Sequence, residues 1–135
     1  MTGKCLCGAV KLTAEKVETE HHACHCGMCR KWAGGGPLMC ATALGVKFEG
    51  EEHIARYASS EWAERGFCKQ CGTALFYFLK PTGMYAMAVG VFDDPSKFQL
   101  VREIFIDRKP PGYALAGDHT RWTEAETFAA FAPKT

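Results

Sequence analysis

Cysteine is the residue type whose spacing in this sequence most clearly indicates chemistry, and that chemistry is metal binding. The chain has 8 cysteines, and all but Cys40 fall into three tight groups. Thiolates one or two residues apart can hold the same tetrahedral ion, whereas a disulfide across so short a gap is strained. In a reducing compartment, clustered cysteines are more often metal ligands or catalytic thiols than disulfides. The groups are Cys5-Leu6-Cys7, Cys24-His25-Cys26-Gly27-Met28-Cys29 and Cys68-Lys69-Gln70-Cys71.

Two of these groups supply two cysteines each, and together they predict one closed site. Four thiolates are the usual ligand set of a structural zinc ion, which here would join the N-terminus to the middle of the chain. A glycine directly follows one cysteine of each group and is expected to turn the backbone so that an N–H points at a bound sulfur. The four thiolates are those of Cys5, Cys7, Cys68 and Cys71, and the glycines are Gly8, Gly27 and Gly72.

The remaining group predicts a second, catalytic zinc ion. It places three ligands on one short segment, which is how a catalytic site with an open fourth position is usually built. The three are Cys24, Cys26 and Cys29. His22, His25 and Cys40 compete to close the fourth position. The histidines are interpreted as neighbours in solvent and Cys40 as a small buried residue, so an open site is favoured.

An open site with three thiolates favours one kind of reaction. The three negative charges over-neutralise Zn²⁺ and make it a weak Lewis acid for activating water, but zinc readily takes a fourth thiolate. The predicted chemistry is therefore activation of a small thiol that then meets an electrophile. Arg30 and Lys31 could pair with carboxylates of that thiol, and the loop Gly34-Gly35-Gly36 could offer backbone N–H groups.

The elements that would position these cysteines are mostly strands. Branched and aromatic residues with partial alternation, separated by glycine and proline turns, predict six of them. One helix is expected, at the C-terminus, where Thr123 and Glu126 form a capping box and Pro133 ends the helix. The strand ranges are Ala9–Ala14, Leu38–Phe48, His53–Ala58, Thr73–Phe78, Met84–Val91 and Leu100–Ile106.

Length and composition limit the classes of protein to consider. A chain of 135 residues is expected to form a single domain over 1–135. Its formal net charge of +1 argues against nucleic-acid binding through phosphate neutralisation. The N-terminus lacks the apolar stretch of a signal peptide, and no run of residues predicts a membrane span. A cytoplasmic location is therefore expected, and the oligomeric state is left open.

Four motifs in this order resemble the glutathione-dependent formaldehyde-activating enzyme family. They are "CLCGAV", "CHCGMCRKWAGG", "SSEWAERGFCKQCGTALFY" and "VGVFDDP", and the resemblance runs from Cys5 to about Trp122. It implies a mainly β fold built from small sheets, called a β-tent, here with a short C-terminal helix. It also implies a structural zinc ion on the first four cysteines named above and a second zinc ion on the other three.

The activity implied by the resemblance is a carbon–sulfur lyase reaction in its bond-forming direction. Glutathione and formaldehyde would condense to S-hydroxymethylglutathione, which agrees with the thiol activation inferred from the cysteines. Many relatives have a histidine where Glu103 stands and an aromatic residue where Gly112 stands, so another small aldehyde is an alternative electrophile. The alternative function is a non-catalytic zinc-binding module on the same scaffold.

Overall fold

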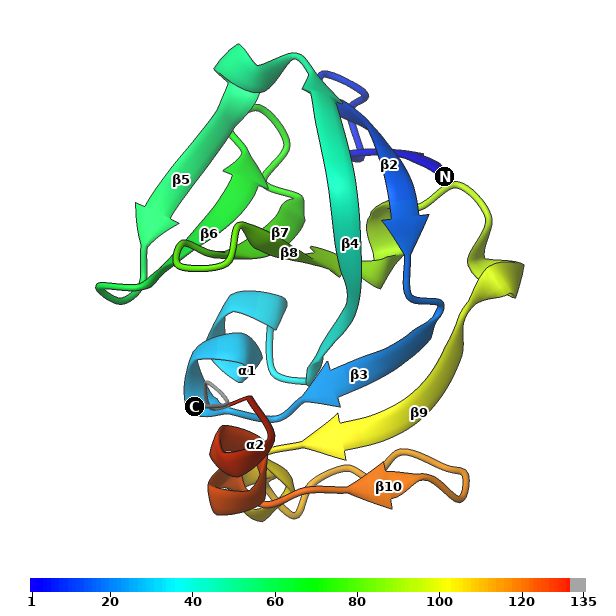
Figure 1. Cartoon of the computed structure of the whole chain (residues 1–135), viewed down its shortest axis with the longest axis vertical. Coiled ribbons are helices and arrows are strands. Elements are labelled where there is room, and N and C mark those ends of the chain that lie inside the picture. Colours follow the sequence, from blue (N-terminus) through cyan, green and yellow to red (C-terminus); the bar gives the residue numbers. More distant parts are fainter. Residues whose placement is uncertain (132–135) are drawn as a thin grey trace.

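The computed structural model describes residues 1–131, and their fold is mainly β (Figure 1). The strands are β1 (Thr2–Lys4), β2 (Lys11–Val17), β3 (Glu20–Cys24), β4 (Leu38–Glu49), β5 (Ile54–Ala58), β6 (Ala63–Cys68), β7 (Ala74–Leu79), β8 (Met84–Ala88), β9 (Gln99–Ile104) and β10 (Thr120–Arg121). The α-helices are α1 (Gly27–Ala33) and α2 (Glu124–Phe131), and the short 3-10 helices are η1 (Glu51–His53), η2 (Val89–Val91), η3 (Pro95–Lys97) and η4 (Ile106–Arg108).

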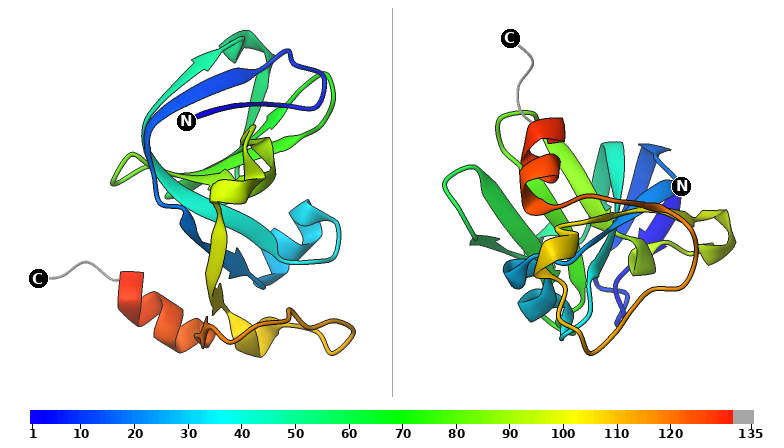
Figure 2. Two further views of the ribbon diagram at one scale, coloured as in Figure 1. Left: turned by 90° about the vertical axis from the view of Figure 1, so that its right-hand side faces the viewer. Right: turned by 90° about the horizontal axis from the view of Figure 1, so that it is seen from below.

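All ten strands belong to one hydrogen-bonded sheet. Its main path runs β10-β9-β3-β4-β8-β7-β6-β5, while β2 pairs with β4 off this path and β1 pairs with β2. The long strand β4 connects two parts of the molecule: β3, β9, β10 and both α-helices lie at one end, and β1, β2 and β5 to β7 lie towards the other (Figures 1 and 2). No helix within residues 1–131 is long and apolar enough to cross a membrane.

Each cysteine cluster lies in its own apolar cluster. Cys5 and Cys68 are buried in the larger one, together with Leu75, Phe76 and Met87. There the Phe76 and Tyr85 rings stand edge to face with centroids 5.0 Å apart, a geometry worth about 1 kcal/mol beyond the area it buries. The smaller cluster contains Cys24, Cys29, Leu38 and Ile104, with the rings of Trp32 and Trp122 packed against it.

The predicted mainly β fold with a short C-terminal helix is confirmed. Strands β2, β4, β5, β7, β8 and β9 overlap the six predicted ranges, and the capping box is formed, since Thr123 Oγ1 accepts from the Glu126 N–H at 3.2 Å. The predicted stop at Pro133 lies outside the described residues. The prediction of a single helix is wrong, because α1 follows β3 directly and carries part of a cysteine cluster.

Candidate functional site

The first cluster brings together the four cysteines predicted to form a closed site. Their sulfur atoms all lie within 4.8 Å of one another. Cys7 Sγ lies 3.7 Å from Cys5 Sγ and 3.8 Å from Cys68 Sγ. A tetrahedral ion with Zn–S bonds of about 2.3 Å places its sulfurs about 3.8 Å apart, so this donor set fits such an ion. The four sulfurs are those of Cys5, Cys7, Cys68 and Cys71.

Two turns shape this cluster in the way that the glycines predict. Gly8 and Gly72 have φ of 81° and 78°, a left-handed conformation that glycine adopts without strain. The Val10 N–H donates to Cys5 Sγ at 3.4 Å, so a backbone amide does point at a cluster sulfur. Gly27 makes no left-handed turn, since it is the first residue of α1, but the Cys29 N–H that follows it does point at Cys26 Sγ.

The second cluster consists of the three remaining predicted ligands. Cys24 ends β3, Cys26 is the N-cap of α1, and Cys29 lies one turn into that helix. Their sulfurs lie within 4.8 Å of one another, and the Cys29 N–H donates to Cys26 Sγ at 3.4 Å. The turn from strand to helix therefore gathers three thiols that are only a few residues apart in sequence.

The close packing of these thiols gives them very different pKa values. Hydrogen bonds with Cys24 and Cys29 hold the pKa of Cys26 far below its ordinary value. Hydrogen bonds with Cys26 and Cys29, together with burial, raise the pKa of Cys24. Three thiolates this close repel one another, so one thiol ionises at the expense of its neighbours. A bound divalent cation would remove this conflict, and the cluster can therefore hold a metal ion.

No fourth side chain completes this group in residues 1–131. His25 is fully buried, but its Nε2 lies 2.7 Å from Glu103 Oε1 and its Nδ1 lies 2.9 Å from Tyr113 Oη. His22 Nε2 accepts from Arg102 at 3.1 Å. Cys40 packs against the same apolar cluster, and burial raises the pKa of its thiol to about 12. His25 is thus not a neighbour in solvent, as the sequence suggests, but a buried anchor.

Glu103 is the centre of a buried polar network that the sequence does not reveal. Its side chain is 1% exposed, and its Oε2 lies 2.5 Å from His119 Nε2 and 2.9 Å from Arg121 Nε. Burial would raise the pKa of Glu103, but hydrogen bonds with His119 and His25 outweigh it, and the pKa is lowered. The network ties the segment before α2 to the residue between two cluster cysteines. His119 is part of it.

Replacing Glu103 by glutamine should therefore destabilise the protein. The amide presents an N–H to partners that are themselves donors, and breaking a buried charged network costs about 3 kcal/mol. Denaturant unfolding at neutral pH measures the loss. Since the folded-state pKa is lowered, the carboxylate's contribution is present above about pH 4.5 and is lost as the pH falls through the folded-state value.

Glu64→Gln is the matched control for this change. Glu64 forms a half-exposed pair with Arg56 at 3.9 Å, and its loss should cost less than about 1 kcal/mol. Equal losses in the two variants would contradict the role given to the Glu103 network.

A hollow of about 610 Å³ is lined by residues of α1 and by Arg65, while none of the three cluster cysteines lines it. Arg65 reaches from it to the cluster, since its Nη1 and Nη2 donate to Cys29 Sγ at 3.5 and 3.6 Å. Lys31 also lines the hollow, where a carboxylate could reach it. The remaining lining residues are Met28, Trp32, Tyr57, Ser59 and Phe67.

Arg30 and the glycine loop after α1, both predicted to hold a thiol, instead bond to backbone carbonyls of the protein. Arg30 donates through its Nε to the carbonyl of His25 at 2.9 Å, which braces the turn between the ligands. The N–H groups of Gly34 and Gly35 both bond to the Arg30 carbonyl and so cap the end of α1. The expectation that these two amides would contact a ligand is therefore wrong.

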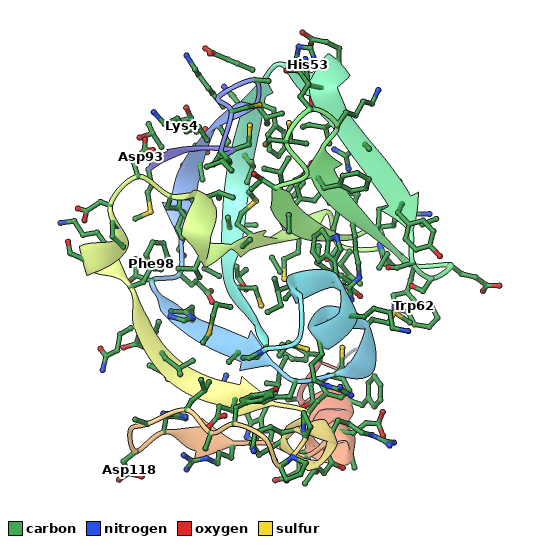
Figure 3. All side chains as sticks on the ribbon, turned by 180° about the vertical axis from the view of Figure 1, so that it is seen from behind. Lys4, His53, Trp62, Asp93, Phe98 and Asp118 are labelled. Atoms are coloured by element: carbon green, nitrogen blue, oxygen red, sulfur yellow. The ribbon has the colours of Figure 1, made fainter. Side chains whose placement is uncertain are left out.

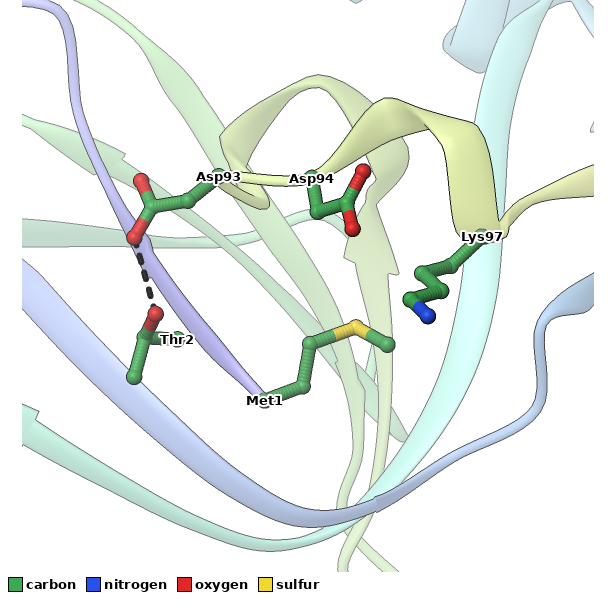
Figure 4. Close-up of a pocket in the computed structure, with 5 residues that line it drawn as sticks. All are labelled: Met1, Thr2, Asp93, Asp94 and Lys97. Atoms are coloured by element: carbon green, nitrogen blue, oxygen red, sulfur yellow. Dashed lines mark hydrogen bonds between the residues drawn. The ribbon is translucent and has the colours of Figure 1, made fainter.

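A second hollow, elsewhere on the molecule, lacks the cysteines of such a site. A hollow of about 380 Å³ lies between the N-terminus and the segment before β9, and it contains no cysteine (Figure 4). Its Asp93 accepts from Thr2 Oγ1 at 2.8 Å, and Asp94 accepts from the Ser96 N–H at 3.1 Å, as expected of a turn. Trp62 is 54% exposed on the surface (Figure 3).

Several known proteins resemble this chain in sequence or in fold. A lyase of Schizosaccharomyces pombe named as uncharacterised is 31% identical over 125 residues, covering 92% of this chain and 91% of its own. A Halomonas elongata protein provisionally named a glutathione-dependent formaldehyde-activating enzyme is 33% identical over 90 residues, 58% of this chain and 55% of its own. A crystal structure of a Rhodobacter sphaeroides protein shares the fold, with a TM-score of 0.62 at 22% identity over 91% of this chain and 100% of its own.

The family model described as glutathione-dependent formaldehyde-activating enzyme matches residues 1–108. This range contains both cysteine clusters, Arg65 and Glu103, while the partners His119 and Arg121 lie beyond it. With 108 of the 135 residues matched, the chain belongs to the glutathione-dependent formaldehyde-activating enzyme family.

Proposed function

We propose that this protein is a zinc-dependent carbon–sulfur lyase-type enzyme that joins glutathione, or a similar small thiol, to formaldehyde or another small aldehyde. Membership of the family and the name of the fission yeast relative as a lyase support this class of reaction. The observation that carries the proposal is the three-sulfur cluster, which no fourth side chain completes in residues 1–131 and which Arg65 links to a nearby hollow.

Two zinc ions per chain are proposed, with different tasks. The closed cluster of Cys5, Cys7, Cys68 and Cys71 would hold a structural ion. The cluster of Cys24, Cys26 and Cys29 would hold the ion at the active site, where these cysteines are the proposed catalytic residues.

The chain's own residues would bind and orient the thiol. Zinc, when bound to the second cluster, would supply a thiophilic cation that favours the ionised form of an incoming thiol. Lys31 lines the hollow, where it could pair with a carboxylate of glutathione, and Trp32 and Phe67 give the hollow apolar walls. A carbon–sulfur bond then forms between the thiol sulfur and the aldehyde carbon, and the carbonyl oxygen takes up the proton that the thiol loses.

Exchange spectroscopy by NMR tests this function, because the addition also proceeds without an enzyme. The zinc-loaded protein should accelerate exchange between glutathione and S-hydroxymethylglutathione in the presence of formaldehyde, and the zinc-loaded Cys26→Ser variant should not. Acceleration by other small aldehydes would extend the substrate class. If the wild-type protein leaves the exchange rate unchanged with every aldehyde, the non-catalytic zinc-binding module is the better description.

A further inference from the structure

Arg65 is a buried cation whose charge is opposed by a sulfur atom. Its side chain is 6% exposed, and both of its terminal nitrogens donate to Cys29 Sγ. None of the ion pairs within residues 1–131 gives Arg65 a carboxylate partner. Since buried charges in proteins are almost always paired, the second cysteine cluster is the counter-charge of Arg65.

The guanidinium is held in one place by aromatic rings. Arg65 lies on β6, opposite Tyr77 of β7, and its guanidinium carbon is 5.2 Å from the ring centres of both Tyr77 and Trp32. Each ring attracts the cation through its face. Arg65 is therefore fixed where its terminal nitrogens meet the cluster, at a wall of the hollow.

The charge of the cluster gives this contact a consequence for ligand binding. Three thiolates and a divalent ion carry one excess negative charge, and an anionic fourth ligand would add a second. A fixed positive charge whose terminal nitrogens lie 3.5 and 3.6 Å from Cys29 Sγ offsets part of that repulsion, and at such a distance the interaction is strong in a partly buried site. A neutral fourth ligand gains nothing comparable from the same charge.

We propose that Arg65 is a positioning residue that makes the second cluster selective for anionic sulfur. It offsets the charge of Cys24, Cys26 and Cys29, so that a thiolate can join them from the hollow. This role rests on the proposed function, because it requires that the cluster accept an external ligand.

Titration of the cobalt-substituted full chain tests the proposal by visible absorption. The two probes are 2-mercaptoethanol, which binds as an anion, and imidazole, which binds as a neutral ligand. In Arg65→Met the apparent affinity for the thiol should fall roughly tenfold to hundredfold, the range for hydrogen bonds to charged groups. The affinity for imidazole should change by less than about threefold, because no charge interaction is lost.

Arg56→Met is the matched control. Arg56 lies on the neighbouring strand β5 and also stacks on aromatic rings, 4.8 Å from the centre of Phe76, but it does not touch the cluster. Its loss should leave both affinities unchanged. Arg65→Lys provides the second variant if the methionine variant fails to fold: it keeps the charge but not the paired donors, and it should bind the thiol roughly threefold to tenfold more weakly.

The outcomes separate the two proposals. A wild-type protein that responds to neither probe overturns the open site and the role of Arg65 with it. A normal wild-type response, with thiol affinity unaltered in the Arg65 variants or with both probes weakened equally, overturns only the role of Arg65.

Discussion

Replacing Cys68 by serine should leave the chain without a stable fold. Cys68 is fully buried in the main apolar cluster and contributes one of the four sulfurs of the closed site. A structural zinc ion contributes about 10–16 kcal/mol of binding free energy, which is as large as the whole stability of a typical domain. Circular dichroism and an amide-resolved NMR spectrum of the variant should show an unfolded chain, and a strong chelator should unfold the wild-type protein in the same way.

Cys40→Ser is the matched control for this prediction. Cys40 is a half-buried cysteine packed against the smaller apolar cluster, and its sulfur belongs to neither cysteine cluster. Burying a hydroxyl in place of this thiol should cost about 1–3 kcal/mol and leave the chain folded. A folded Cys68→Ser variant with unchanged stability would show that the first cluster does not hold the fold together.

Replacing Cys26 by serine should abolish metal binding at the second cluster while the protein remains folded. Only two thiols would be left there, which is too few to retain zinc. Helix α1 should persist, because serine is itself a preferred N-cap residue and can accept the Cys29 N–H that Cys26 Sγ accepts now. Elemental analysis should find about one zinc ion per chain in place of about two.

The two cysteine variants must differ if the clusters have separate tasks. The Cys26→Ser protein should unfold in a single cooperative transition and lose its response to thiols. If it is as unfolded as Cys68→Ser, the division into a structural and a functional site is wrong.

The grouping of the cysteines could be predicted from sequence because metal ligands impose a local spacing. Cys24, Cys26 and Cys29 lie on one turn, so their meeting needs little information about the rest of the fold. The match between the pairs Cys5/Cys7 and Cys68/Cys71 depended on counting ligands: four thiolates complete a tetrahedral site, and no other pair was left over.

The elements around the second cluster were missed because their sequences carry weak local signals. Strand β3 reads EHHAC and owes its conformation to pairing with β4 on one side and β9 on the other. Helix α1 reads GMCRKWA, begins with glycine and has no apolar periodicity. Its caps define it: the sulfur of Cys26 at its start and the left-handed Gly34 at its end.

The polar contacts of the site join residues that are far apart in the sequence, so local sequence patterns could not predict them. Glu103 lies 78 residues from His25 and 16 from His119, and Arg65 lies 36 residues from Cys29. From sequence alone, a charged residue in a strand is interpreted as facing solvent, because its burial is not known. Arg102 and Glu103 could have raised the question, since they interrupt the otherwise apolar stretch LVREIFI.

Native mass spectrometry of the zinc-loaded chain, with and without glutathione, tests the open thiol-accepting site most directly. Two zinc ions per chain are expected, with one glutathione retained per chain when the thiol is present. The Cys26→Ser variant should retain one zinc ion and no glutathione. A wild-type chain that holds zinc at its four-cysteine cluster alone and retains no glutathione would contradict the proposed site.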